Sequence, residues 1–114
     1  MSVVTPFPQR ERREAVATFD RIELQRILDL YGRMVAAGHW RDYGLSFHPD
    51  VAIFAAFRRA TERPEARIEK RPSLRLKQGA FAVVGEHGAV LWRGHDLGGV
   101  IAPLERRLMR LVAE

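Results

Sequence analysis

The sequence contains no cysteine. Disulfide bonds, thiolate nucleophiles and cysteine-ligated zinc sites are therefore excluded, and a small secreted domain held by disulfides is not expected. Long hydrophobic runs are also missing, since the longest covers only residues 51–57, far below the roughly 20 residues that a membrane helix requires. No apolar run of signal-peptide length follows a basic start. We expect a cytoplasmic protein that does not contact a membrane.

Motifs of known chemistry are absent as well. The four histidines, His39, His48, His87 and His95, show no paired spacing, so no metal site is expected. Ser46 and Ser73 lack the glycine neighbours of a hydrolase nucleophile, and no phosphate-binding glycine loop precedes a helix. We expect no catalytic residue and no cofactor, and hence a protein that is not an enzyme. A weaker alternative is an enzyme that uses His95 and Asp42.

The length and composition predict one folded domain. The chain has 114 residues, of which 46% are hydrophobic and 29% charged, which is typical of soluble globular proteins. Residues 1–17 combine two prolines with a charged run that has no apolar face, so we expect a flexible N-terminal arm. Residues 18–114 form the expected single domain.

A helix of about five turns is predicted after Asp20. Asp20 can cap the first backbone amides, and Glu23 stands three residues later, as in a capping box. Gly38 is expected to end this helix in a left-handed conformation. The apolar stripe recurs at spacings of three and four residues: Leu24, Ile27, Leu28, Tyr31, Met34 and Val35.

Five strands are predicted next, beginning with an alternating pattern over residues 43–47. The run 51–57 is apolar at every position, so it is expected to be buried on both faces of the sheet as the central strand. Residues 66–71 are mostly charged, which predicts a strand near an edge that Pro72 ends. Residues 80–84 and 89–93 form a hairpin around a four-residue loop, while 73–78 fit a strand or a helical turn.

A last helix is predicted after Asp96, which can cap it. Pro103 lies inside its apolar stripe without changing the phase, so we expect one kinked element. The predicted fold is thus α+β, with an N-terminal helix, a five-stranded antiparallel meander and a C-terminal helix.

The sheet is expected to place Tyr43, Phe47, Ile53 and Phe57 on one face, under the two helices. Ala52, Phe54 and Ala56 would then lie on an uncovered apolar face, which a second copy of the chain could cover.

Several blocks resemble a family of small alphaproteobacterial proteins catalogued only as a domain of unknown function. These blocks are YGRMVAAG (31–38), WRDY (40–43), RIEKRP (67–72), QGA (78–80) and RGHDL (93–97). The likeness runs from about residue 19 to residue 104. The resemblance implies a cytoplasmic bacterial protein and carries no assigned activity, ligand or catalytic residue.

The charge of the chain is concentrated in residues 58–77. This window holds eight basic and three acidic residues, which accounts for the whole net charge of +5. Clustered Arg and Lys can bind a phosphate backbone, so we predict a non-enzymatic regulatory module that binds nucleic acid. The expected contacts are Arg58, Arg59, Arg67, Lys70, Arg71, Arg75 and Lys77.

Two questions stay open at this level. Trp40, just past the first helix, is the first candidate for stacking on a base, although the apolar register of the aromatic residues favours core packing. The basic window could also be a solvated edge of the sheet. It could equally be the surface of a protein-interaction module that binds an acidic protein, and such a module could be a homodimer.

Overall fold

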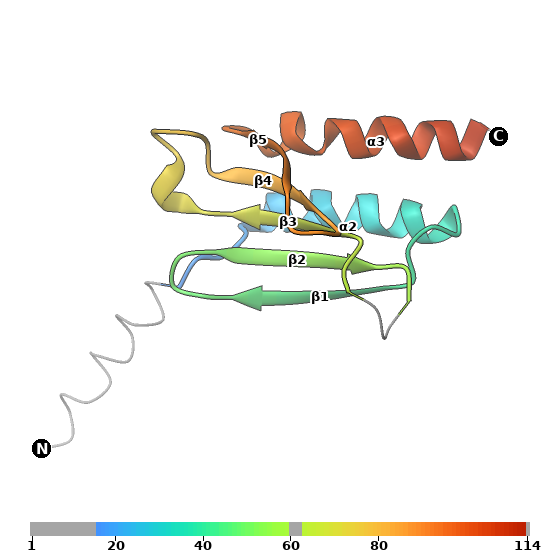
Figure 1. The fold of residues 1–114 in the computed structure, drawn as a ribbon, viewed down its shortest axis with the longest axis horizontal. Coiled ribbons are helices and arrows are strands. Elements are labelled where there is room, and N and C mark those ends of the chain that lie inside the picture. Colours follow the sequence, from blue (N-terminus) through green and yellow to red (C-terminus); the bar gives the residue numbers. More distant parts are fainter. Residues whose placement is uncertain (1–15, 60–62, 114) are drawn as a thin grey trace, which may run out of the picture.

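The computed structural model describes residues 16–59 and 63–113. Most of the predicted N-terminal arm lies outside the described residues. The elements, in chain order, are α2 (Arg21–Ala36), β1 (Asp42–Phe47), β2 (Ala52–Phe57), β3 (Ala66–Lys70), the 3-10 helix η2 (Pro72–Leu74), β4 (Phe81–Gly85), β5 (Val90–Gly94) and α3 (Leu97–Ala113) (Figure 1). The predicted α+β class, with a helix, a five-stranded antiparallel meander and a second helix, is confirmed.

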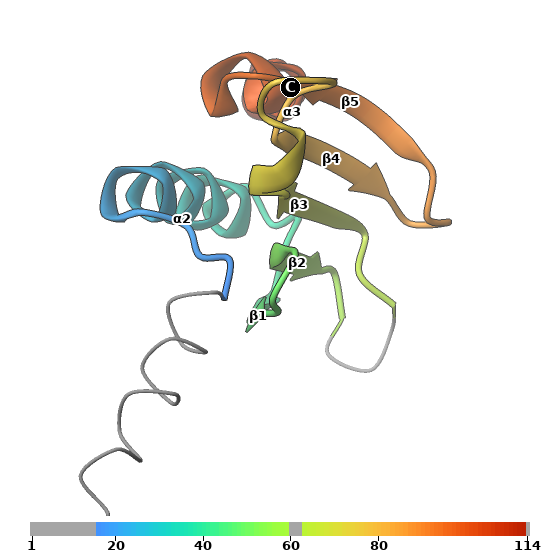
Figure 2. The same cartoon turned by 90° about the vertical axis from the view of Figure 1, so that its left-hand side faces the viewer.

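The five strands form one antiparallel sheet in the order β1-β2-β3-β4-β5. Both helices cover the same face of this sheet, which leaves a helix-free face on the other side (Figure 2). Because each strand pairs with its neighbour in the chain, the middle of the sheet is β3 and not residues 51–57. The prediction that 66–71 lies near an edge was therefore wrong. Arg67 and Glu69 are tolerated in the middle because they project from the helix-free face, whereas Lys70 lies on the helix-covered face and pairs with Glu23.

The assignment of residues to the two faces was also wrong. The β1–β2 register places Tyr43 opposite Ala56 and Phe47 opposite Ala52, so the aromatic residues of β1 share a face with Phe54. Phe54 is fully buried under the helices, whereas Ile53 and Phe57 lie half-buried on the helix-free face. A shift of one residue in the register reverses every side chain, and the turn at 48–50 sets that register.

The ends of α2 follow the sequence signals. The Asp20 carboxylate accepts a hydrogen bond from the Glu23 amide at 2.8 Å, and Glu23 accepts one from the Asp20 amide at 2.8 Å. Gly38 adopts a left-handed φ of 78° just past the helix, which confirms its predicted role. Along the helix, Ile27, Leu30 and Met34 are buried against the sheet.

Helix α3 runs through Pro103 as a single element, as predicted. The Asp96 carboxylate accepts a hydrogen bond from the Gly99 amide at 3.0 Å and caps the first turn. Its buried side chains pack over β4 and β5: Leu97, Val100, Ile101, Leu104 and Leu108. Among the described residues, neither helix combines the length and the apolar character needed to cross a bilayer.

The ambiguous segment 73–78 forms the end of η2 and the turns that follow it. Gly79 closes this segment with a φ of 105° and packs its backbone directly against that of Gly94. A side chain at this position would collide with the Gly94 backbone, so glycine is required for the connection between β3 and β4.

Candidate nucleic-acid interface

The structure does not bring the seven predicted contact residues onto one surface. Arg58 and Arg59 follow the end of β2, whereas Arg75 and Lys77 lie in the loop past the opposite end of β3. These two groups are separated by the length of β3, roughly 15 Å. The charge excess of the sequence is therefore divided between two ends of the molecule.

Lys70 lies on the helix-covered face, away from the other cations. Its ammonium group lies 2.7 Å from Glu23 Oε1 and 5.8 Å from the centre of the Phe81 ring. The Lys70 side chain is only 19% exposed. Lys70 therefore connects the first turn of α2 to the sheet, a structural role that its place in a run of charges does not indicate.

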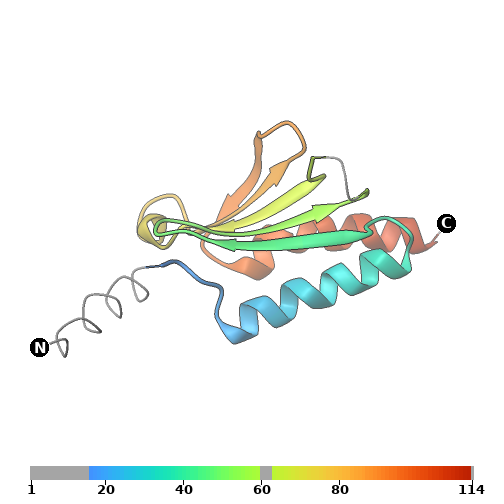
Figure 3. The ribbon, with the colours of Figure 1, turned by 90° about the horizontal axis from the view of Figure 1, so that it is seen from below.

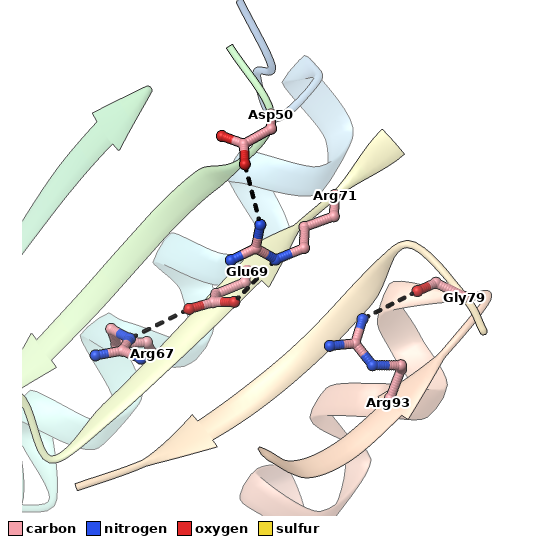
Figure 4. A network of polar contacts seen from close by, with 6 residues as sticks. All are labelled: Asp50, Arg67, Glu69, Arg71, Gly79 and Arg93. Atoms are coloured by element: carbon pink, nitrogen blue, oxygen red, sulfur yellow. Dashed lines mark hydrogen bonds and ion pairs between the residues drawn. The ribbon is translucent and has the colours of Figure 1, made fainter. Parts of the chain in front are cut away.

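Arg67 and Arg71 belong to a network on the helix-free face (Figure 4). The buried carboxylate of Glu69 lies between them, 3.3 Å from Arg67 Nε and 3.6 Å from Arg71 Nε. Arg71 also reaches Asp50 at 3.3 Å. Two guanidinium groups thus face two carboxylates, so this part of the helix-free face carries little net charge.

Arg93 lies near this network, on β5. Its guanidinium donates a hydrogen bond to the Gly79 carbonyl at 3.3 Å, which fastens the β3–β4 connection (Figure 4).

A pocket rich in arginine opens at the end of the sheet where Arg58 and Arg59 lie. It has a volume of about 730 Å³ and is called the arginine pocket below. Its lining residues are Val35, Gly38, His39, Trp40, Arg41, Arg58, Arg59 and Glu86. Three arginines and one glutamate, Glu86, therefore line one concave, mostly polar site.

The hairpin geometry explains why these arginines meet. Asp42 pairs with Phe57 in the β1–β2 register, and the Arg41 amide donates a hydrogen bond to the Phe57 carbonyl at 2.8 Å. Arg41 therefore stands next to Arg58, although the two are 17 positions apart in the printed sequence. Arg41 lies outside the charged window 58–77, so the local charge excess of the sequence does not indicate it.

Glu65 and His39 are largely buried beneath the arginine pocket. Glu65 Oε1 accepts a hydrogen bond from Trp40 Nε1 at 2.7 Å and lies 3.0 Å from His39 Nε2. Its other oxygen lies 3.8 Å from Arg58 Nε. Burial lowers the pKa of His39, and the neighbouring Glu65 carboxylate opposes this effect only in part. The imidazole is therefore neutral at neutral pH.

Trp40 cannot serve as the predicted stacking platform, because its side chain is only 1% exposed. It packs in the core beside Tyr31 and Phe54, with ring centres 6.2 Å and 6.4 Å away. The indole contributes a buried wall and a hydrogen bond to Glu65, so the core-packing interpretation of Trp40 is correct.

His95 and Asp42, the alternative catalytic residues, are also far apart. Asp42 lies on β1 and His95 follows β5, at opposite edges of the five-stranded sheet, roughly 19 Å apart in strand spacing alone. His95 Nδ1 instead lies 3.0 Å from the Arg75 carbonyl oxygen. In the part of the chain that the structure describes, no three His, Asp or Glu side chains are grouped to hold a metal ion.

These features define a small α+β domain with two helices on one face of a sheet and an arginine-lined pocket at one end. A family model described as a protein of unknown function (DUF2794) matches residues 17–101 of the sequence. The chain belongs to this family. The comparisons with curated proteins and with solved structures found no match.

Proposed function

We propose that the protein is a non-enzymatic regulatory module that binds nucleic acid, with the arginine pocket as its phosphate-binding part. The observation that carries this proposal is the convergence of Arg41, Arg58 and Arg59 on one concave site. A guanidinium group can donate two parallel hydrogen bonds to a phosphate, and such contacts position a nucleic acid without reading its sequence. The pocket volume lies in the range of small-ligand sites.

The predicted contact residues outside the arginine pocket differ in whether they can reach a bound nucleic acid. Arg67 and Arg71 can join the interface only if phosphate replaces Glu69 and Asp50 as their partners. Arg75 and Lys77 lie at the far end of β3 and are outside the proposed site.

The salt dependence of binding gives the first test. Three phosphate contacts predict a slope of log affinity against log salt of about −2 for single strands and about −3 for duplex DNA. The affinity should then fall roughly 20- to 40-fold between 50 and 200 mM salt. Fluorescence anisotropy with labelled single-stranded RNA, single-stranded DNA and duplex DNA measures this slope. A salt-independent affinity would contradict phosphate binding.

A pair of charge reversals tests the location. The Arg58→Glu/Arg59→Glu double variant should abolish most binding, because it replaces two of the three pocket cations with carboxylates. The matched control is Arg75→Glu/Lys77→Glu, which changes the net charge equally at the other end of β3. Equal losses in both double variants would show a diffuse charge effect and refute a pocket-based site. Circular dichroism verifies that both variants fold.

An acidic protein is the second candidate partner, since Asp and Glu carboxylates can take the same bidentate hydrogen bonds from the pocket arginines. Affinity purification with and without nuclease separates the two proposals. A partner that stays bound after nuclease treatment, and is lost with Arg58→Glu/Arg59→Glu, would favour the protein partner.

We also propose a bacterial cytoplasmic setting, and specifically an alphaproteobacterial one. This part of the proposal rests on the sequence resemblance and on the complete lack of cysteine.

A further inference from the structure

The edge strand β1 lacks the features that usually protect a sheet edge. Its sequence, Asp42–Phe47, contains no lysine, arginine or proline, and its register with β2 runs without a bulge. The other edge strand, β5, contains Arg93 and an irregular register next to Val83 and Val84. Figure 3 views the molecule from the β1 side, where β1 is the outermost strand of the sheet and α2 runs beside it.

The side chains of β1 leave one side of the core open. Tyr43, Leu45 and Phe47 point to the helix-covered face, yet they remain 40%, 36% and 44% exposed. Tyr43 already packs against Tyr31 of α2 and Phe54 of β2, with ring centres 4.7 Å and 5.5 Å away. The aromatic part of the core therefore continues to the β1 edge of the sheet, where Tyr43, Leu45 and Phe47 remain partly exposed.

The backbone of β1 is turned outward at the same residues. The Tyr43 amide donates a 2.8 Å hydrogen bond to its neighbour Asp42 Oδ1, so it faces away from β2. Since backbone groups alternate in direction along a strand, Leu45 and Phe47 also present their amide and carbonyl groups to the edge. In the described part of the chain, the amide and carbonyl groups of Leu45 and Phe47 and the Tyr43 carbonyl are available to a further strand, whereas the Tyr43 amide is already bonded to Asp42.

We infer that β1 pairs antiparallel with β1 of a second copy of this chain. The register with Leu45 on the twofold axis places Leu45 opposite Leu45, Tyr43 opposite Phe47 and Asp42 opposite His48 of the second copy. All three outward-facing residues then bond across the interface, with about four backbone hydrogen bonds, or about six once the Asp42 carboxylate releases the Tyr43 amide. Aromatic side chains meet on the helix-covered face, and the Asp42 carboxylate can accept a hydrogen bond from the His48 imidazole of the second copy.

This strand is self-complementary, which favours a second copy over another partner. A twofold axis through Leu45 joins the two sheets into one continuous sheet and keeps both helix layers on the same side. The second copy thereby covers the exposed sides of Tyr43, Leu45 and Phe47 with the same residues of its own. The predicted homodimer is thus placed at the β1 edge rather than on a face of the sheet.

Sedimentation of the 114-residue chain tests the dimer. We expect a mass of twice the 13.0 kDa of one chain. Leu45→Lys should reduce the mass to that of a monomer, because two ammonium groups would meet on the twofold axis. The matched control is Leu76→Lys, which makes the same change at a residue that is 86% exposed in the loop after β3 and should remain a dimer.

Cross-linking gives a second test that does not depend on a destabilising charge. Because the chain has no cysteine, Leu45→Cys introduces a single thiol, which faces its own copy across the axis. The Cα atoms of such a hydrogen-bonded pair lie about 5.5 Å apart, within disulfide range. We expect a disulfide-linked dimer in oxidising buffer for Leu45→Cys and little for Leu76→Cys.

A wild-type chain that sediments as a monomer at the highest soluble concentration overturns the inference. Equal cross-linking of Leu45→Cys and Leu76→Cys overturns it as well, as does a dimer that Leu45→Lys leaves intact. None of these readouts involves nucleic acid, so they are independent of the proposed function.

Discussion

At the scale of single residues, Glu65 is the side chain on which the inner wall of the arginine pocket depends. It is 14% exposed and accepts the 2.7 Å hydrogen bond from the buried Trp40 indole. Glu65→Ala leaves that indole N–H without an acceptor, which should lower the free energy of unfolding by about 1–3 kcal/mol. Urea denaturation followed by circular dichroism measures the loss.

The Glu65→Gln variant is the control for this prediction. Its amide oxygen can still accept the hydrogen bond from Trp40, so its loss should be clearly smaller than that of Glu65→Ala. Similar stabilities of the wild-type protein and Glu65→Ala would show that the indole finds another partner.

At the scale of the elements, the cap at the N-terminus of α2 can be tested by a single substitution. Asp20→Ala removes the acceptor of the Glu23 amide, and we expect a loss of about 1 kcal/mol, within the range of about 0.5–2 kcal/mol for such caps. The urea midpoint at constant slope reports this change.

A control for the cap lies within the same helix. Asp29→Ala removes an exposed carboxylate whose ion pair with Arg33 is 3.9 Å long, so it should cost less than about 0.5 kcal/mol. If both variants unfold at the same urea concentration, the hydrogen bond from the Asp20 carboxylate does not contribute to stability.

At the scale of the whole molecule, His39 makes the folding equilibrium depend on pH. Burial lowers the pKa of His39 in the folded protein from its ordinary value of 6.5. The unfolded chain therefore binds a proton at a higher pH than the folded chain does, so protonation favours unfolding. The stability from neutral His39 is fully present above pH 6.5 and is lost as the pH falls below 6.5 toward the folded pKa.

Thermal unfolding between about pH 7 and about pH 5 measures this loss, before most carboxylates titrate. We expect the Tm of the wild-type protein to fall more over this interval than that of His39→Gln, which cannot take up the proton. Parallel curves for the two proteins would show that His39 binds a proton equally well in both states.

Much of the fold could be predicted because its signals are local. The Asp20 capping box, the Gly38 terminus and the continuous α3 across Pro103 each depend on a few neighbouring residues, and the structure contains all three. The site was harder to predict, because charge along the chain says nothing about which face or end a side chain occupies. Lys70 and Arg71 are neighbours in sequence, yet they pair with Glu23 on the helix-covered face and with Asp50 and Glu69 on the other.

The sequence by itself determined the class of fold, the approximate bounds of its elements and the excess of positive charge, since these follow from periodicity, capping and composition. Only the tertiary structure decided the strand order, the face that the helices cover and the meeting of Arg41 with Arg58 and Arg59. The physical reason is that strand pairing depends on register between distant residues. A register changed by one residue would send Phe54 to the uncovered face and rebuild both the core and the pocket.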